Sequence, residues 1–127
     1  MGAPTVATRL QRRCVLLCAD AGMRGALEAA LPEGWTLTAG AAGTVPEGYA
    51  EVLQHRFVLL DLDETAAFDP IELIERLRGE MMLNVPIFCF GGDAARRDAA
   101  RLARADRFFE RGEIAHMLPR FCAQFAW

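Results

Sequence analysis

Short apolar segments alternate along this chain with longer segments in which apolar residues recur at helical spacing. The apolar segments are the length of buried strands rather than of helices, and turn residues follow them. The segment that ends at Asp61 is the most apolar of them. We therefore predict five strands, over residues 14–20, 35–40, 56–61, 85–90 and 106–111.

The segments between these strands carry apolar residues three and four positions apart, which predicts helices. Asp69 is expected to cap one of them, with Pro70 at its first position. Pro119 is expected to kink or split the last one, because proline removes a helical hydrogen bond. The predicted helices cover residues 21–31, 46–55, 69–81, 93–105 and 112–125.

Strands and helices that alternate with short connections predict a doubly wound α/β domain, in which helices cover both faces of a five-stranded parallel sheet. The length of 127 residues suits one hydrophobic core and is short for two. Residues 1–12 show no period and contain Gly2 and Pro4, so we expect a loose tail there. Residues 13–127 are expected to form the single domain.

The charge and hydropathy of the chain argue against nucleic-acid binding and membrane association. A net charge of −3 gives no general attraction to nucleic acid or to an anionic membrane surface. No apolar run approaches the roughly 20 residues of a membrane span, and the first residues lack the apolar block of a signal peptide. We expect a cytoplasmic protein. Four cysteines lie in apolar segments and are expected to be buried, reduced thiols: Cys14, Cys18, Cys89 and Cys122.

Polar chemistry in a doubly wound sheet gathers at the carboxyl ends of the strands. Asp20, Asp61 and Asp63, together with Glu64, could form an acidic cluster that holds a cation. Arg111 is expected to pair with one of these acids, and Asp20 is also suited to cap the helix that follows it. The residues predicted at this edge are Asp20, Asp61, Asp63, Gly91, Gly92 and Arg111.

One resemblance is to the haloacid dehalogenase phosphatases. "FVLLDLDET" (57–65) resembles their first motif, a hydrophobic strand followed by Asp-x-Asp-x-Thr, and "GGDAARRD" (91–98) resembles their late acidic motif. The resemblance implies that Asp61 is a nucleophile and Asp63 its acid/base partner. That family also needs a later Ser or Thr and a Lys to neutralise an aspartyl phosphate, and none occurs after Thr65. A phosphohydrolase is therefore the alternative hypothesis.

The second resemblance is to response-regulator receiver domains, the CheY-like family, and it covers most of the chain. It rests on Asp20 after the first strand, Asp61 after the third, "VP" at 85–86 and "ADRFFERG" at 105–112. The resemblance implies a flavodoxin-like sheet with strand order 2-1-3-4-5.

The same resemblance implies a role for each matching position. Asp61 would accept a phosphoryl group from a phosphohistidine. Mg²⁺ would be held by Asp20, Asp61 and the backbone carbonyl of Asp63. The family's second acid at the end of strand one is replaced by Ala19. We therefore expect Mg²⁺ binding to be weak.

Three further positions concern the phosphate and the switch. Gly91 stands where the family has Thr or Ser, so no hydroxyl can follow the phosphate. Arg111 stands at the Lys position and keeps the charge, but delivers it through a wider planar fork. Phe108 is the switch aromatic and lacks a phenolic hydroxyl. Together these changes predict that phosphorylation-linked switching is impaired.

The leading hypothesis is an atypical receiver domain of a two-component-type regulatory protein, without enzymatic activity. It would act through a histidine kinase or output domain, or by self-association through the segments at 93–105, 106–111 and 112–125. Direct nucleic-acid binding is not expected. A second alternative is a phosphorylation-independent dimerisation module of a transcription regulator. The interface candidates are Arg97, Arg101 and Arg104, predicted on one helix face, with acids such as Asp98, Asp106 and Glu110 of a partner copy.

Overall fold

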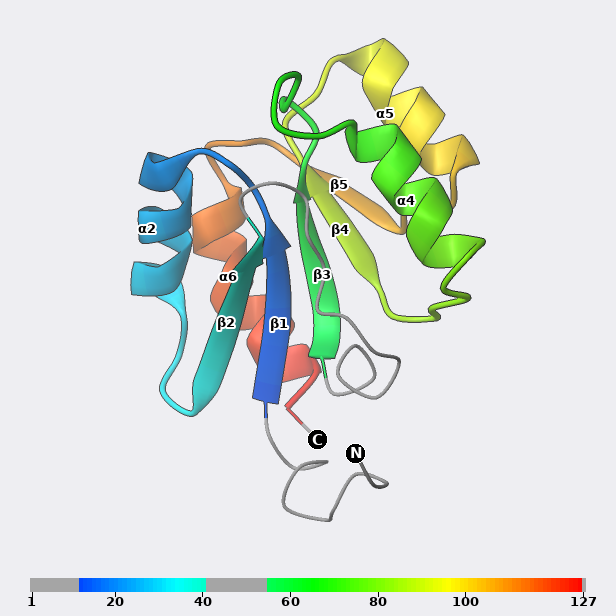
Figure 1. The fold of residues 1–127 in the computed structure, drawn as a ribbon. Helices are drawn as coiled ribbons and strands as arrows, with labels where there is room; N and C mark the ends of the chain where they lie inside the picture. Colours follow the sequence, from blue (N-terminus) through cyan, green and yellow to red (C-terminus); the bar gives the residue numbers. More distant parts are fainter. Residues whose placement is uncertain (1–11, 41–54, 127) are drawn as a thin grey trace.

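A five-stranded, all-parallel sheet in the order β2-β1-β3-β4-β5 forms the centre of the domain (Figure 1). The computed structural model describes residues 12–40 and 55–126. The observed order and the parallel pairing confirm the predicted fold class. The strands are β1 (Arg12–Leu17), β2 (Trp35–Gly40), β3 (His55–Asp61), β4 (Ile87–Phe90) and β5 (Arg107–Phe109).

Helices cover both faces of the sheet, as Figure 1 shows. One pair packs on one face and the other pair on the opposite face, each against its own hydrophobic cluster. The helix predicted over 46–55 lies outside the described residues except for His55, which begins β3 instead, and so does the predicted tail except for Arg12, which begins β1. The described helices are α2 (Ala21–Ala30) and α6 (Ile114–Gln124) on one face, and α4 (Pro70–Arg78) and α5 (Ala94–Leu102) on the other.

The central strand, β3, lies between β1 and β4 and is buried along all seven residues. Its side chains alternate between the two faces, as a pleated strand requires. Val58 and Leu60 belong to the cluster under α4 and α5, whereas Phe57 and Leu59 belong to the cluster under α2 and α6. This two-sided burial explains the unbroken apolar run that leads to Asp61.

The cysteines lie inside these clusters. All four are free and buried, as predicted. Cys14 and Cys18 both face α2 and α6. Burial raises the pKa of Cys14 and of Cys89 to about 12.

Several element boundaries differ from those predicted. β4 begins at Ile87, because Pro86 has no N–H for the ladder and contributes only its carbonyl, which accepts from Val58 N at 2.8 Å. β5 ends at Phe109, because the next amide, Glu110 N, donates to the Glu113 side chain at 2.8 Å.

The helices also end earlier than predicted, and the last one is not split. Pro119 does not split α6, which runs through it as a single helix. Leu118 and Phe121, on either side of the proline, are buried in the same cluster and hold both halves against the sheet. Asp69 caps α4 and Pro70 is its first residue, as predicted. Among the described residues, no helix is long and apolar enough to cross a membrane.

Candidate functional site

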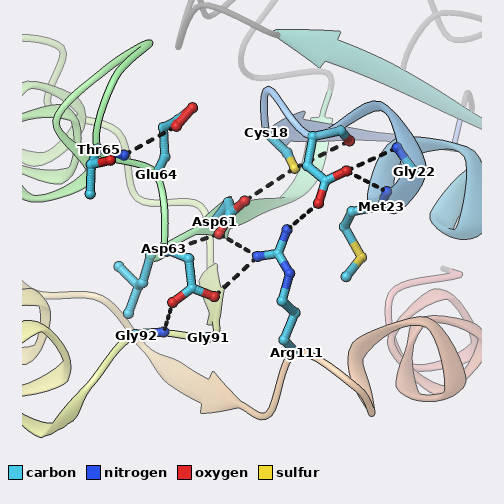
Figure 2. A network of polar contacts seen from close by, with 12 residues as sticks. Cys18, Gly22, Met23, Asp61, Asp63, Glu64, Thr65, Gly91, Gly92 and Arg111 are labelled. Atoms are coloured by element: carbon cyan, nitrogen blue, oxygen red, sulfur yellow. Dashed lines mark hydrogen bonds and ion pairs between the residues drawn. The ribbon is translucent and has the colours of Figure 1, made fainter.

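The carboxyl ends of the parallel strands meet at one edge of the sheet and bring together acids from distant parts of the sequence. Asp61 is the last residue of β3, and Asp20 follows β1 by three residues. Arg111 follows β5 by two residues, and its side chain reaches back over this edge among Cys18, Asp61 and Asp63 (Figure 2). Asp20, Asp61, Asp63 and Arg111 therefore lie together at this edge, as predicted.

The guanidinium of Arg111 contacts three carboxylates. Its Nη1 donates to Asp61 Oδ1 at 2.7 Å and to Asp63 Oδ2 at 3.1 Å, and its Nη2 donates to Asp20 Oδ2 at 2.8 Å. Its carbon lies 5.5 Å from the centre of the Phe90 ring. The hydrogen bond to Asp61 is the main reason that the pKa of Arg111 is raised, so the guanidinium stays charged. Sequence reasoning expected one acid as its partner, and the structure provides three.

Asp61 is almost enclosed, with 5% of its side chain exposed. Its Oδ1 accepts from Arg111 and from the backbone N–H of Asp63 at 2.9 Å. Its Oδ2 accepts from Cys18 Sγ at 3.3 Å. Burial raises the pKa of Cys18 to about 11, so the thiol keeps the proton that it donates. Both oxygens of the predicted phosphoacceptor are thus engaged.

Asp20 has two roles at once. Its Oδ1 accepts from Gly22 N at 2.9 Å and Met23 N at 3.2 Å, which makes it the N-cap of α2. Its Oδ2 faces Arg111, and that hydrogen bond is the main reason that the pKa of Asp20 is lowered. The capping role was predicted; the simultaneous ion pair fixes the carboxylate on both sides.

Asp63 occupies the place that a side chain at position 91 would need. Gly91 has φ +73°, and a Cβ built there would lie 2.1 Å from Asp63 Oδ2. Asp63 Oδ1 accepts from Gly92 N at 2.8 Å, which holds the carboxylate in that position. The resemblance assigned the Asp63 carbonyl to Mg²⁺, whereas in the structure the Asp63 side chain contacts Gly92 N and Arg111.

The residues at this edge do not fit a divalent cation in the arrangement observed. Among the residues that the structure describes, no group of three or more His, Cys, Asp or Glu side chains is placed to hold a metal ion. The reason lies in the donors: Asp20, Asp61 and Asp63 each direct an oxygen at Arg111. A guanidinium and a metal ion cannot use the same oxygens in the same place.

Sequence reasoning missed two residues of the site. Cys18 was expected only as a core thiol, although its place two residues before Asp20 puts it near the strand end. Arg96, in the first turn of α5, donates through Nη1 to the carbonyls of Leu62 and Glu64 and so holds the loop after β3. Its position at the start of a helix that faces this edge was the available signal.

The predicted interface arginines are only partly where they were expected. Arg104 is not on the helix face, because α5 ends at Leu102 and Arg104 has φ +79°. Arg101 pairs with Asp98 at 2.9 Å and lies over the ring of Phe108 at 4.8 Å, so the predicted switch aromatic is covered by a cation.

The acids expected to meet a partner copy are paired within the chain. Glu110 accepts from Arg97 Nη2 at 3.2 Å. Asp106 accepts from Arg78 Nη2 at 2.7 Å and from Ile87 N at 2.7 Å. Their pairing with arginines of a second copy stays a prediction, and it would have to form beside or in place of these internal contacts.

The late acids of the phosphatase resemblance serve α5. Asp93 is its N-cap and accepts from Arg96 N at 2.8 Å, while Asp98 pairs with Arg101. Both carboxylates therefore have ordinary structural roles. The arrangement does not favour a phosphohydrolase.

Comparison with known proteins identifies the fold. No protein-family model matches the chain, and no curated protein does. A response-regulator receiver protein from Pseudoalteromonas atlantica is similar in structure, with TM-score 0.69 and 20% identity over 89% of this chain and 95% of that one. A signal receiver domain from Bermanella marisrubri gives TM-score 0.69 and 19% identity over 91% and 98%.

A third solved structure agrees with these two. A response regulator described as putative, from Chloroflexus aurantiacus, gives TM-score 0.68 and 18% identity over 90% of this chain and 96% of that one. The chain thus has the fold of CheY-like receiver domains along most of its length. Identities this low establish the fold alone.

Proposed function

We propose that this chain is a signal-receiver domain of a two-component-type regulator, which acts by binding a partner and not as an enzyme. The observation that carries the proposal is the position of Asp61, the last residue of the central strand of a receiver fold. The nearly enclosed carboxylate lies at the edge where such a sheet collects its functional groups. A histidine kinase and an output domain are the classes of partner that follow, with a cytoplasmic location.

We further infer that phosphorylation of Asp61 is impaired. One of its oxygens accepts from Arg111 and the other from Cys18, so an incoming phosphorus atom must displace a donor from either oxygen. Position 91 supplies no hydroxyl, and the space for one is filled by Asp63. Each contact that is missing from the phosphorylated state, or that must be given up to reach it, makes that state less favourable. A charge-assisted hydrogen bond of this kind contributes about 1.5–3 kcal/mol.

Phosphorylation is tested with a small phosphodonor and Mg²⁺, read by intact mass. We expect no adduct, or a small fraction of one, from the wild-type chain. A phosphorylation-competent receiver in the same reaction is the positive control. A nearly complete adduct of one phosphoryl group that disappears in Asp61→Asn would show that phosphorylation is not impaired.

The same samples address the phosphohydrolase alternative. A generic phosphate ester should be turned over no faster than by Asp61→Asn. Metal-dependent turnover that is lost in both Asp61→Asn and Asp63→Asn would favour the phosphohydrolase instead.

A further inference from the structure

The cation at the centre of the acidic edge is part of the polypeptide. Arg111 lies within hydrogen-bond distance of Asp20, Asp61 and Asp63, and 31% of its side chain is exposed. The three acids come from the ends of β1 and β3 and from the loop after β3, so their like charges are brought together by the fold. Such charges repel one another, and a cation between them offsets the repulsion.

We propose that Arg111 is the resident cation of this site, and that it replaces a divalent metal ion. The proposal rests on the receiver function proposed above, since it is the receiver fold that implies a metal at this edge. The guanidinium neutralises part of the acidic charge permanently. The site is consequently complete without Mg²⁺ and insensitive to it.

The shape of the guanidinium suits this role. Its two terminal nitrogens donate in different directions, so Nη1 serves Asp61 and Asp63 while Nη2 reaches Asp20 on another strand. A lysine ammonium at the same position is a single point and cannot present this planar fork. The ring of Phe90 lies beneath the guanidinium and restricts its position further.

Each carboxylate is also fixed from its other side. Asp20 is held by the amides at the start of α2, and Asp63 by Gly92 N. Asp61 is held by the amide of Asp63 and by the thiol of Cys18. The acids are therefore pre-oriented around the guanidinium, and a metal ion would have to displace Arg111 and reorient them.

The test compares the wild type with Arg111→Met, which removes the charge and keeps much of the apolar stem. Thermal unfolding is followed without divalent ions and with millimolar Mg²⁺ or Mn²⁺. We expect the midpoint of the wild type to be unaffected by either ion. Arg111→Met should unfold at a lower temperature, and either ion should raise its midpoint, because three carboxylates have then lost their cation.

Arg97→Met is the matched control. Arg97 lies at the same edge and pairs with Glu110, but not with the three acids. Its removal should leave the protein insensitive to both ions. A folded Arg111→Met that does not respond to metal overturns the proposal, because the acids would then need no cation.

A measurement on the wild type alone keeps the proposal testable if Arg111→Met does not fold. Mn²⁺ is titrated into the ¹⁵N-labelled protein, and paramagnetic broadening is followed by NMR. Broadening confined to the amides of Asp61, Asp63 and Gly92 at micromolar Mn²⁺ overturns the proposal. Equal, weak effects over the surface support it.

These outcomes are separable from those of the proposed function. If the wild type does not respond to metal and binds neither a kinase nor an output domain, the proposed receiver function is contradicted. The proposal that Arg111 is the resident cation is then still supported. If the wild type is phosphorylated readily, and equally with and without Mg²⁺, the resident cation is supported. Only the inferred impairment of phosphorylation is then contradicted. Phosphorylation that requires Mg²⁺ overturns the resident cation.

Discussion

Asp61 accepts three hydrogen bonds in a space that leaves 5% of its side chain exposed, and one of the donors is a cation. Removing that cation leaves a buried carboxylate without a counter-charge. The cost of breaking a fully buried pair in this way is about 3–5 kcal/mol. Because Arg111 is 31% exposed, solvent compensates for part of the loss.

We therefore predict that Arg111→Ala lowers the free energy of unfolding by about 2 kcal/mol, measured by urea denaturation. Arg97→Ala is the comparison, since its partner Glu110 is 73% exposed. The ion pair with this exposed acid should contribute less than about 1 kcal/mol, and the hydrogen bond from Arg97 Nε to the carbonyl of Gly91 at 3.1 Å is lost with it. Equal losses in the two variants would mean that the burial of Asp61 does not decide the cost.

Gly91 and Asp63 are predicted to be coupled. A Cβ at position 91 would overlap Asp63 Oδ2, and the backbone there has positive φ. Gly91→Ala should therefore destabilise the protein, and part of that cost should vanish when Asp63→Ala is already present. A double-mutant cycle in urea should give a coupling energy of about 1 kcal/mol or more. Strict additivity would show that backbone strain alone explains the glycine.

At the scale of elements, Asp20 joins a helix to the site. It caps α2 and pairs with Arg111, and the ion pair lowers its pKa in the folded state. A lowered folded-state pKa stabilises the protein at pH values above the ordinary carboxyl value of about 3.9. That stabilisation is lost as the pH falls through the folded-state pKa.

The corresponding prediction uses Asp20→Asn, because asparagine caps helices about as well as aspartate but carries no charge. The variant should be less stable than the wild type at neutral pH and should approach it as the pH falls below about 4. Urea denaturation across the acidic range measures the difference. A constant difference at all these pH values would assign the effect to the cap alone.

The elements themselves were largely predictable from the sequence. The apolar runs predicted where the strands lie along the sequence, and their polar ends placed Asp20, Asp61 and Arg111 at one edge. The order of the strands in the sheet was implied by the resemblance to receiver domains. What could not be predicted was which atoms meet there, because hydrogen-bond pairing depends on side-chain conformations and on loop paths that no periodicity records. Cys18 shows this: hydrophobic patterning placed it in the core, and only the structure shows its thiol at Asp61.

Element ends were the least predictable feature. The Ala- and Arg-rich segment continues its helical pattern past Leu102, yet α5 stops there. The chain turns there into a left-handed residue, Arg104, and Ala105 N closes the helix end by donating to the carbonyl of Ala100. A tertiary contact holds this turn, because the carbonyl of Arg104 accepts from Arg78 Nε at 3.1 Å. Placing Arg104 on the helix face was wrong for this reason.

At the scale of the whole molecule, the face formed by α5, β5 and α6 remains the predicted surface for self-association. Arg101 is 60% exposed there and covers Phe108. If copies associate through this face, Arg101→Glu should shift the oligomer toward monomer in size-exclusion chromatography with light scattering. Arg76→Glu, a charge reversal at a 51% exposed arginine of α4, should not. A monomer in all three samples would exclude this face.

The contact between Arg111 and Asp20 joins residues 91 positions apart, and the contact with Asp61 joins residues 50 positions apart. Contacts of such high sequence separation require most of the chain to be in place before they form. On a growing chain, the acids after β1 and β3 are therefore present before their cation is made. The order of synthesis therefore keeps this edge from its final electrostatic state until the chain has been made through Arg111.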